Sequence, residues 1–150
     1  MAYYENFIDI EKPRELVFNY LAVPSNWPEF MPTTTEVRPV INRSLNVGDQ
    51  VTEVLNVLGS KLDIQWTCKT NDFPSSYEIE GICQKRGGSR ALISFEFSGD
   101  NGVTNIKRVI QFRFDNPIMR LFDPIWKFYF IYEARGCFKR AKEILESKGN

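Results

Sequence analysis

The residues of this chain that could do chemistry are acidic residues, tyrosines, lysines and arginines, because the sequence contains no histidine. That absence removes the usual near-neutral general base, the commonest metal ligand and the group that activates Ser-His-Asp and Cys-His nucleophiles. We therefore expect no metal and no cofactor. Any catalysis would use carboxylates, Tyr, Lys, Arg or ordered water.

Arg108 is the strongest candidate for a polar anchor in apolar surroundings. In the last predicted strand it shares one face with Ile106, Ile110 and Phe112, and that face is expected to point inward. A buried guanidinium needs a carboxylate or an anionic ligand, since an unpaired buried charge costs several kcal/mol. Three roles are open for Arg108: a ligand or substrate anchor, half of an ion pair with Glu53, or a cation that reaches solvent at the strand end.

The three cysteines, Cys68, Cys83 and Cys137, are widely spaced and include no Cys-x-x-Cys pair. This spacing indicates free thiols in a reducing compartment, and we expect small buried hydrophobes rather than nucleophiles. The N-terminus lacks the apolar segment of a secretory signal, and the aromatic stretch 118–132 is too short and too charged to span a bilayer. We predict a cytoplasmic protein without a transmembrane segment.

Composition favours one ordinary globular domain over residues 1–150. Hydrophobic residues make up 43% and charged residues 25% of the chain, which suffices for a real core. Nineteen basic residues balance nineteen acidic ones, so no net field would attract nucleic acid. We expect no nucleic-acid partner, and the sequence leaves the oligomeric state open.

Hydrophobic periodicity predicts mostly strands followed by one long helix. Strands are predicted at 3–10, 36–42, 50–58, 61–69, 77–83, 91–97 and 104–114, with two short helical pieces after the first strand and turns at Gly59-Ser60 and Gly87-Gly88. Asn116 through Glu146 is predicted as one helix or two nearly collinear ones. Its apolar face is predicted to comprise Leu121, Ile125, Phe128, Tyr129, Tyr132, Cys137, Ala141, Ile144 and Leu145, with Lys127 and Glu133 on the solvent side.

These elements predict an α+β fold. An antiparallel sheet of about seven strands with one apolar face would curve around the long C-terminal helix, in the helix-grip arrangement. Side chains need not fill the space between a curved sheet and one helix. We therefore predict a cavity there.

Four stretches carry a family resemblance: IDIEKPRELVFNYLAVPSNWPEFMP near the start, GDQV from Gly48, GVTNIKRVIQFRF from Gly102, and the terminal helix. They resemble the START and Bet v 1-like (SRPBCC) superfamily, which includes polyketide cyclase/dehydrase-like and coenzyme Q-binding-like proteins. The resemblance implies a hydrophobic cavity between sheet and helix, with its mouth near the early short helices. Members differ in ligand and reaction, so it does not imply an enzyme.

The candidate ligand-binding residues are Trp27, Phe30, Trp66, Tyr77, Phe95, Phe97, Arg108, Phe112, Phe128 and Tyr132. Each aromatic among them could equally be ordinary core. The first functional hypothesis is binding or carrying of a hydrophobic small molecule such as a lipid, an isoprenoid quinone or a polyketide-like aromatic. The alternatives are a cyclase or dehydratase in which Arg108 with Tyr77 or Glu53 handles protons, and a partner- or membrane-facing module that uses residues 118–132.

Overall fold

The chain folds as one curved antiparallel sheet gripping a long helix. The structure is a computed structural model that describes residues 2–85 and 88–148. The sheet has seven strands in the order β1-β7-β6-β5-β4-β3-β2. The strands are β1 (Ala2–Ile10), β2 (Thr34–Arg38), β3 (Gln50–Val57), β4 (Ser60–Asp72), β5 (Ser76–Cys83), β6 (Ser89–Ser98) and β7 (Thr104–Phe114). Strands β2 to β7 pair in sequence order, and β1 closes the far edge against β7.

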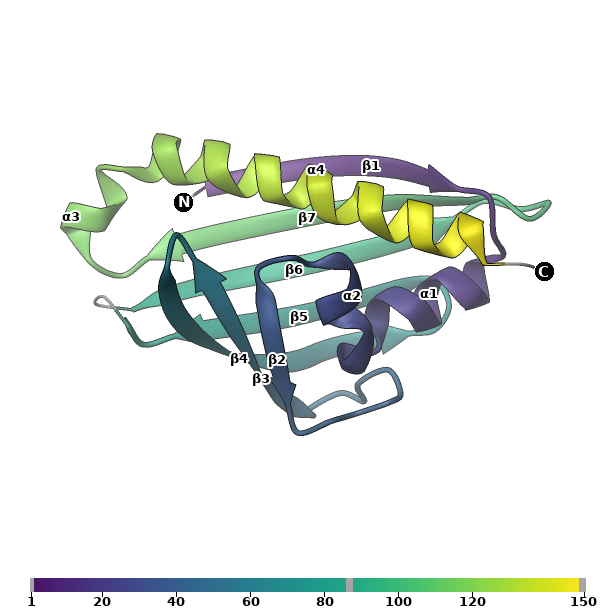
Figure 1. Cartoon of the computed structure of the whole chain (residues 1–150), viewed down its shortest axis with the longest axis horizontal. Helices are drawn as coiled ribbons and strands as arrows, with labels where there is room; N and C mark the ends of the chain where they lie inside the picture. Colours follow the sequence, from purple (N-terminus) through teal and green to yellow (C-terminus); the bar gives the residue numbers. More distant parts are fainter. Residues whose placement is uncertain (1, 86–87, 149–150) are drawn as a thin grey trace.

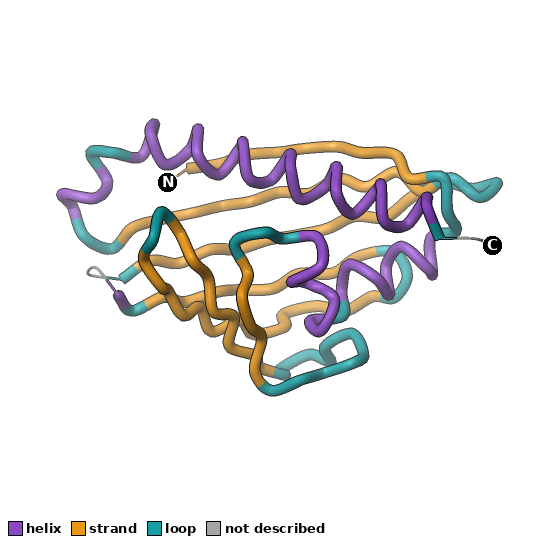
Figure 2. The backbone as a smooth tube through the Cα atoms, in the orientation of Figure 1, coloured by secondary structure: helices purple, strands orange, loops and turns teal. Residues whose placement is uncertain are grey.

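The helices lie at the beginning and the end of the chain. They are α1 (Arg14–Ala22), the 3-10 turn η1 (Pro24–Asn26), α2 (Trp27–Phe30), α3 (Pro117–Arg120) and α4 (Asp123–Ser147). In Figure 1, α4 runs along the sheet, while α1 and α2 lie beside its C-terminal half and α3 lies off its axis at the opposite end. Figure 2 shows the same division between sheet and helices. The predicted α+β helix-grip architecture is confirmed.

Period-two alternation predicts the strand faces correctly. On β4, Trp66 and Cys68 are buried, and their polar neighbours face outward. On β3, the sequence left the inward face open, and the structure buries Val51 and Glu53 on the same face. Alternate residues of β3 and β4 therefore point into the interior.

Two turns need comment. The β3–β4 turn is Leu58-Gly59 rather than Gly59-Ser60, with φ of 52° and 82° at its two residues and Val57 paired with Ser60. This is the hairpin type that requires the left-handed conformation at both positions, one residue earlier than predicted. The predicted Gly87-Gly88 turn lies partly outside the described residues.

The single apolar face predicted for the terminal helix is wrong in its first half. Ile125, Phe128 and Tyr132 are 66–78% exposed, whereas Trp126 and Phe130 turn toward the sheet. This part of the helix is apolar on almost every side, so periodicity alone does not select the buried face. Aromatic contacts select it: Trp126 lies 5.5 Å from Phe114 and Phe130 lies 4.7 Å from Phe112, between ring centroids.

The molecule has one tightly packed end, where α1 and the second half of α4 meet the sheet. Six side chains there are at most 1% exposed: Ile10, Val17, Phe18, Ile106, Ala141 and Leu145. The backbone nitrogen of Glu11 donates to the Glu146 carboxylate at 2.9 Å, and the Thr104 hydroxyl donates to the Lys12 carbonyl at 2.7 Å. These bonds join the β1–α1 connection to β7 and to the end of α4. The opposite end, at α3, is the hollow one.

Candidate functional site

Two adjoining cavities meet at Arg108 and Glu53, on the inner face of the sheet. The larger, of about 200 Å³, is under the first half of α4, and the smaller, of about 60 Å³, is under α1 and α2. Both are bordered by Met31, Glu53, Trp66, Ile93 and Arg108. The remaining wall of the larger cavity is mainly apolar and includes Leu55, Leu62, Ile64, Ile110, Phe112, Met119, Trp126 and Phe130. The polar groups at the junction therefore face a largely apolar space.

Arg108 stands at the junction of the two cavities, on β7. It is only 5% exposed. Its Nε donates to Asn6 Oδ1 at 3.0 Å and its Nη2 donates to the Ala134 carbonyl at 2.6 Å, while its guanidinium carbon lies 3.8 Å from the centroid of the Phe138 ring. Burial lowers the pKa of Arg108 to about 10, so the side chain remains a cation at neutral pH. Its Nη1 makes no hydrogen bond to a described residue.

Glu53 faces the same junction from β3. Trp66 Nε1 donates to one carboxylate oxygen at 2.6 Å, and the Thr34 hydroxyl lies 2.5 Å from the other. Burial raises the pKa of Glu53 above its ordinary value, and the two hydrogen bonds only partly oppose this effect. Glu53 is thus a carboxyl that binds its proton more tightly than an exposed one.

Arg108 and Glu53 do not form the ion pair that the sequence left open. Among residues 2–85 and 88–148, no carboxylate lies within 4 Å of the Arg108 guanidinium nitrogens. Asn6, a backbone carbonyl and an aromatic ring take the place of a carboxylate. The cavity wall therefore carries a cation that protein acceptors bind but do not neutralise.

Glu133 is a cavity residue that the sequence reasoning assigned to solvent. It is half-buried and borders the larger cavity from α4. One signal could have placed it there: it lies three residues after Phe130 and four before Cys137, so a helix puts all three on one side.

Tyr77 lies on the smaller cavity with its hydroxyl buried. The side chain is 2% exposed, and the hydroxyl has no hydrogen-bond partner among the described residues. Burial raises the pKa of Tyr77 strongly, so it stays a neutral phenol. A buried unpaired hydroxyl is uncommon and is usually satisfied by water or a ligand.

The ten candidate residues do not all come together. Seven border a cavity: Trp27, Phe30, Trp66, Tyr77, Phe95, Arg108 and Phe112. Phe97 is core: it is 3% exposed, its ring centroid lies 5.0 Å from that of Phe18 in a tilted contact, and it borders neither cavity. Phe128 and Tyr132, expected to line the ligand space, instead lie on the outer side of α4 at 75% and 78% exposure. Both residues were misplaced because the sequence predicted the wrong buried side for the first half of α4.

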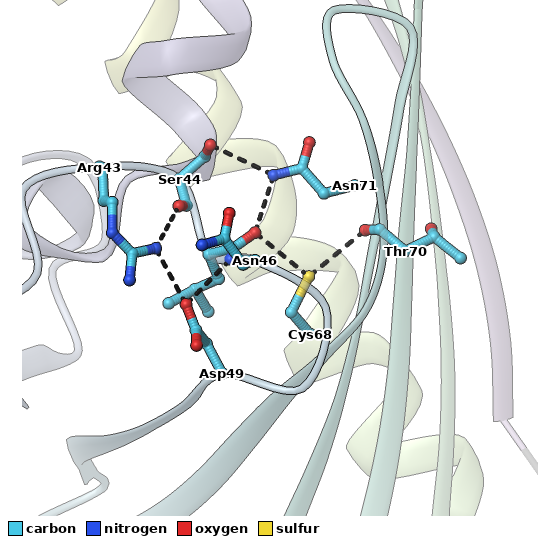
Figure 3. A network of polar contacts seen from close by, with 8 residues as sticks. Arg43, Ser44, Asn46, Asp49, Cys68, Thr70 and Asn71 are labelled. Atoms are coloured by element: carbon cyan, nitrogen blue, oxygen red, sulfur yellow. Dashed lines mark hydrogen bonds and ion pairs between the residues drawn. The ribbon is translucent and has the colours of Figure 1, made fainter.

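The surroundings of the three cysteines indicate a structural role. All three are free and buried. Figure 3 shows Cys68 inside a polar network in which its sulfur lies 3.4 Å from the carbonyl oxygens of Leu45 and Thr70, either of which can accept the thiol hydrogen, beside an Arg43–Asp49 ion pair of 2.9 Å. Burial raises the pKa values of Cys68 and Cys137 to about 11. Both therefore remain protonated thiols, which are poor nucleophiles and poor metal ligands.

The part of the chain that the structure describes carries neither a metal-binding cluster nor a membrane-spanning helix. No group of three or more His, Cys, Asp or Glu side chains there could hold a metal ion. No helix within residues 2–85 and 88–148 is both long and apolar enough to cross a bilayer.

Sequence comparisons find no relatives, whereas structural comparison finds many. No family model matches the chain, and no curated protein matches it. A conserved protein from Geobacillus kaustophilus superposes with a TM-score of 0.80 at 12% identity, over 97% of this chain and 95% of that one. Ara h 8.0201 gives 0.70 at 15% identity, over 98% and 99%. A START superfamily protein from Mycobacterium smegmatis gives 0.72 at 10% identity, over 96% and 97%.

These similarities extend over nearly the full length of each chain. The fold is therefore the START/Bet v 1-like fold, and the resemblance seen in the sequence is confirmed at this level. Identities of 10–15% establish the fold alone. Function has to be argued from the cavity.

Proposed function

We propose that this chain binds a hydrophobic small molecule carrying one anionic or carbonyl group, in the cavity between the sheet and α4. The observation that supports this most directly is Arg108, a buried cation without a described carboxylate partner, set in a mainly apolar wall. Apolar area supplies the binding energy in such sites, and a few placed donors fix orientation. The free Nη1 of Arg108 is such a donor.

The volume of the cavity limits the size of the ligand. A cavity of about 150 Å³ holds a benzene molecule, so about 200 Å³ suits a substituted aromatic ring or a short isoprenoid or acyl segment. A longer chain would extend toward α3. Three free, buried cysteines are consistent with binding in the reducing cytoplasm.

The cavity can be tested by filling it. Ala91 lies on the cavity face of β6, and Leu92 lies on the opposite face of the same strand. Ala91→Phe should lower the affinity for a fluorescent fatty acid or quinone analogue by roughly tenfold or more, whereas Leu92→Phe should leave it unchanged. Native mass spectrometry of the purified wild-type chain would show whether a small molecule copurifies. Equal affinities in both variants would place the ligand elsewhere.

The anchor can be tested separately. Arg108→Met keeps length and apolar character and deletes the charge. An anchoring role predicts weaker binding of an anionic probe, by roughly tenfold, with little change for an uncharged probe of the same shape. An equal loss of affinity for both probes would show that Arg108 contributes only to the shape of the cavity wall and does not anchor the charged group.

Glu53 supports a second candidate function, which is cyclase- or dehydratase-like catalysis. A carboxyl with a raised pKa on the wall of a largely apolar cavity can donate a proton to a carbonyl or hydroxyl oxygen, and Arg108 at the same junction can stabilise developing negative charge. Carrier and enzyme are separated by incubating the chain with a candidate ligand and analysing its mass. A carrier returns the ligand unchanged.

A further inference from the structure

The hollow end of the molecule exposes much apolar surface. Seven large side chains there are 47–81% exposed, and we call them the apolar rim: Leu58, Ile118, Leu121, Phe122, Ile125, Phe128 and Tyr132. Since a large side chain presents roughly 150–250 Å² when fully exposed, the apolar rim totals on the order of 900 Å². Patches on typical monomers reach only about 300–600 Å². Exposed apolar surface of this extent marks an interaction site.

The apolar rim surrounds the approach to the larger cavity. Met119 on α3 and Trp126 on α4 line that cavity, while Ile118 and Ile125, their neighbours in the chain, point to solvent. Val57, at the end of β3, also lines the cavity, and the exposed Leu58 follows it. Figure 1 shows α3, the start of α4 and the β3–β4 turn at the same end of the molecule. The segments that carry the apolar rim therefore also supply part of the cavity wall.

Charge at this end is positive although the whole chain is neutral. Residues 57–63, the described part of 83–90, and 113–127 contain six basic residues, Lys61, Lys85, Arg90, Arg113, Arg120 and Lys127, against three acidic ones, Asp63, Asp115 and Asp123. The contacts place these segments together: Lys85 Nζ donates to the Lys61 carbonyl at 2.7 Å, and Arg90 is paired with Arg113 across β6 and β7.

We propose that the apolar rim docks the chain on the surface of an anionic phospholipid bilayer. Exposed aromatic and aliphatic side chains surrounded by Lys and Arg are the combination that inserts into the interfacial layer while basic groups contact lipid phosphates. A second copy of this chain fits less well, because two such ends facing each other would bring like charges together. Docking would place the cavity approach against the acyl chains, so an apolar molecule could pass between bilayer and cavity without crossing water.

The chain offers matched variants for a direct test. Phe128 and Phe7 are the same residue type at 75% and 68% exposure, one in the apolar rim and the other on the outer face of β1. Lys127 and Lys139 are exposed lysines on the two halves of α4. Sedimentation of the full chain with vesicles of phosphatidylcholine alone, and of phosphatidylcholine with about 30% phosphatidylglycerol, measures docking.

We expect binding to the anionic vesicles, weakened at about 1 M salt, where screening acts within about 3 Å. Phe128→Ser should reduce the partition coefficient by roughly tenfold, while Phe7→Ser leaves it unchanged. Lys127→Glu should reduce it more than Lys139→Glu. Ile125→Ser replaces Phe128→Ser if the latter does not fold.

Three outcomes would overturn the proposal: no binding to either vesicle, equal losses in rim and control variants, or a dimer by sedimentation velocity that Phe128→Ser dissociates without any vesicle binding. Vesicle docking does not depend on what occupies the cavity. A failure of the docking proposal would therefore not affect the ligand-binding experiments on Ala91 and Arg108. A failure of the ligand-binding proposal would likewise not affect the docking experiments.

Discussion

Glu53 and Arg108 are two enclosed ionisable side chains on one cavity wall, and each is held by neutral partners. Trp66 and Thr34 hold the carboxylate, while Asn6 and the Ala134 carbonyl hold the guanidinium. Neither charge is cancelled by direct contact. Both remain available to a polar ligand, and both make the folded state sensitive to substitution.

Glu53 should make stability depend on pH. Because burial raises its folded pKa, the unfolded chain releases this proton first, and unfolding is coupled to proton release. The contribution to stability is complete below the ordinary pKa of 4.5 and is lost as pH rises toward the folded value. The free energy of unfolding of Glu53→Gln should therefore increase relative to that of the wild type as pH rises from about 5 to 8. Urea unfolding measures this difference.

The control is Glu96→Gln, which removes an exposed carboxylate from β6. Its stability should follow the wild-type pH curve. If the stability of Glu53→Gln varies with pH in the same way as that of the wild type, the pKa of Glu53 is the same in the folded and the unfolded chain, and the prediction fails.

Arg108→Met should destabilise the fold only moderately. The substitution leaves Asn6 and the Ala134 carbonyl without their donor, at a cost of about 1–3 kcal/mol. Breaking a buried ion pair would cost more, about 3–5 kcal/mol. Arg113→Met, on the outer face of the same strand, should stay within about 0.5 kcal/mol of wild type. A loss in the higher range, by denaturant titration, would show that a carboxylate had been left unpaired.

At the scale of elements, the Trp66 side chain of β4 covers Gly81, the residue opposite it on the neighbouring strand β5. A Cβ added at Gly81 would lie 2.6 Å from the Trp66 ring and 2.8 Å from Ile64 Cγ2. Only glycine lets the indole lie flat over β5 while its nitrogen reaches Glu53. In α4, Gly136 has the opposite surroundings: it is exposed, and an added Cβ would meet nothing within 4 Å.

The two glycines should respond with opposite signs to the same substitution. Gly81→Ala should cost about 1–3 kcal/mol through overpacking against Trp66, and Gly136→Ala should gain about 0.5–1 kcal/mol because alanine favours the helix. Thermal unfolding of both variants measures this. Shifts of Tm in the same direction would contradict the placement of one of them.

Strands were predictable from this sequence because each has one buried face, and a one-residue slip would expose its entire apolar set. Arg108 was accordingly assigned to the inward side, and Glu53 was named as its possible partner. Their separation was not predictable, since alternation gives the face of a side chain and not its reach. The first half of α4 was mispredicted for another reason: Trp126, Phe128 and Phe130 offer apolar surface in several directions, and only the tertiary contacts with β7 decide between them.

At the scale of the whole molecule, packing is uneven from end to end. The second half of α4 ends over a closed core, with Ala141 and Leu145 at most 1% exposed. The first half covers a cavity and turns apolar residues to water. Local opening should therefore require less free energy near α3 than near the C-terminus.

Hydrogen exchange should show this gradient along one helix. Amides in 134–145 should exchange most slowly, and those in 126–133 faster by on the order of tenfold to a hundredfold. Occupation of the cavity should slow exchange in 126–133 selectively, because a ligand contacts Trp126 and Phe130. Uniform protection along α4, with and without ligand, would show that the cavity does not weaken the first half.

The pairing of β1 with β7 sets the order in which the chain can fold during synthesis. Strands β3 to β7 each pair with the preceding strand, so these hairpins can form as the ribosome releases them. β1 leaves first but has no partner until β7 emerges, and the bond from Arg108 to Asn6 spans 102 positions. Closing so long a loop is slow. The first strand to be made is therefore among the last to be placed, and until then its apolar face is open to chaperones and to other nascent chains.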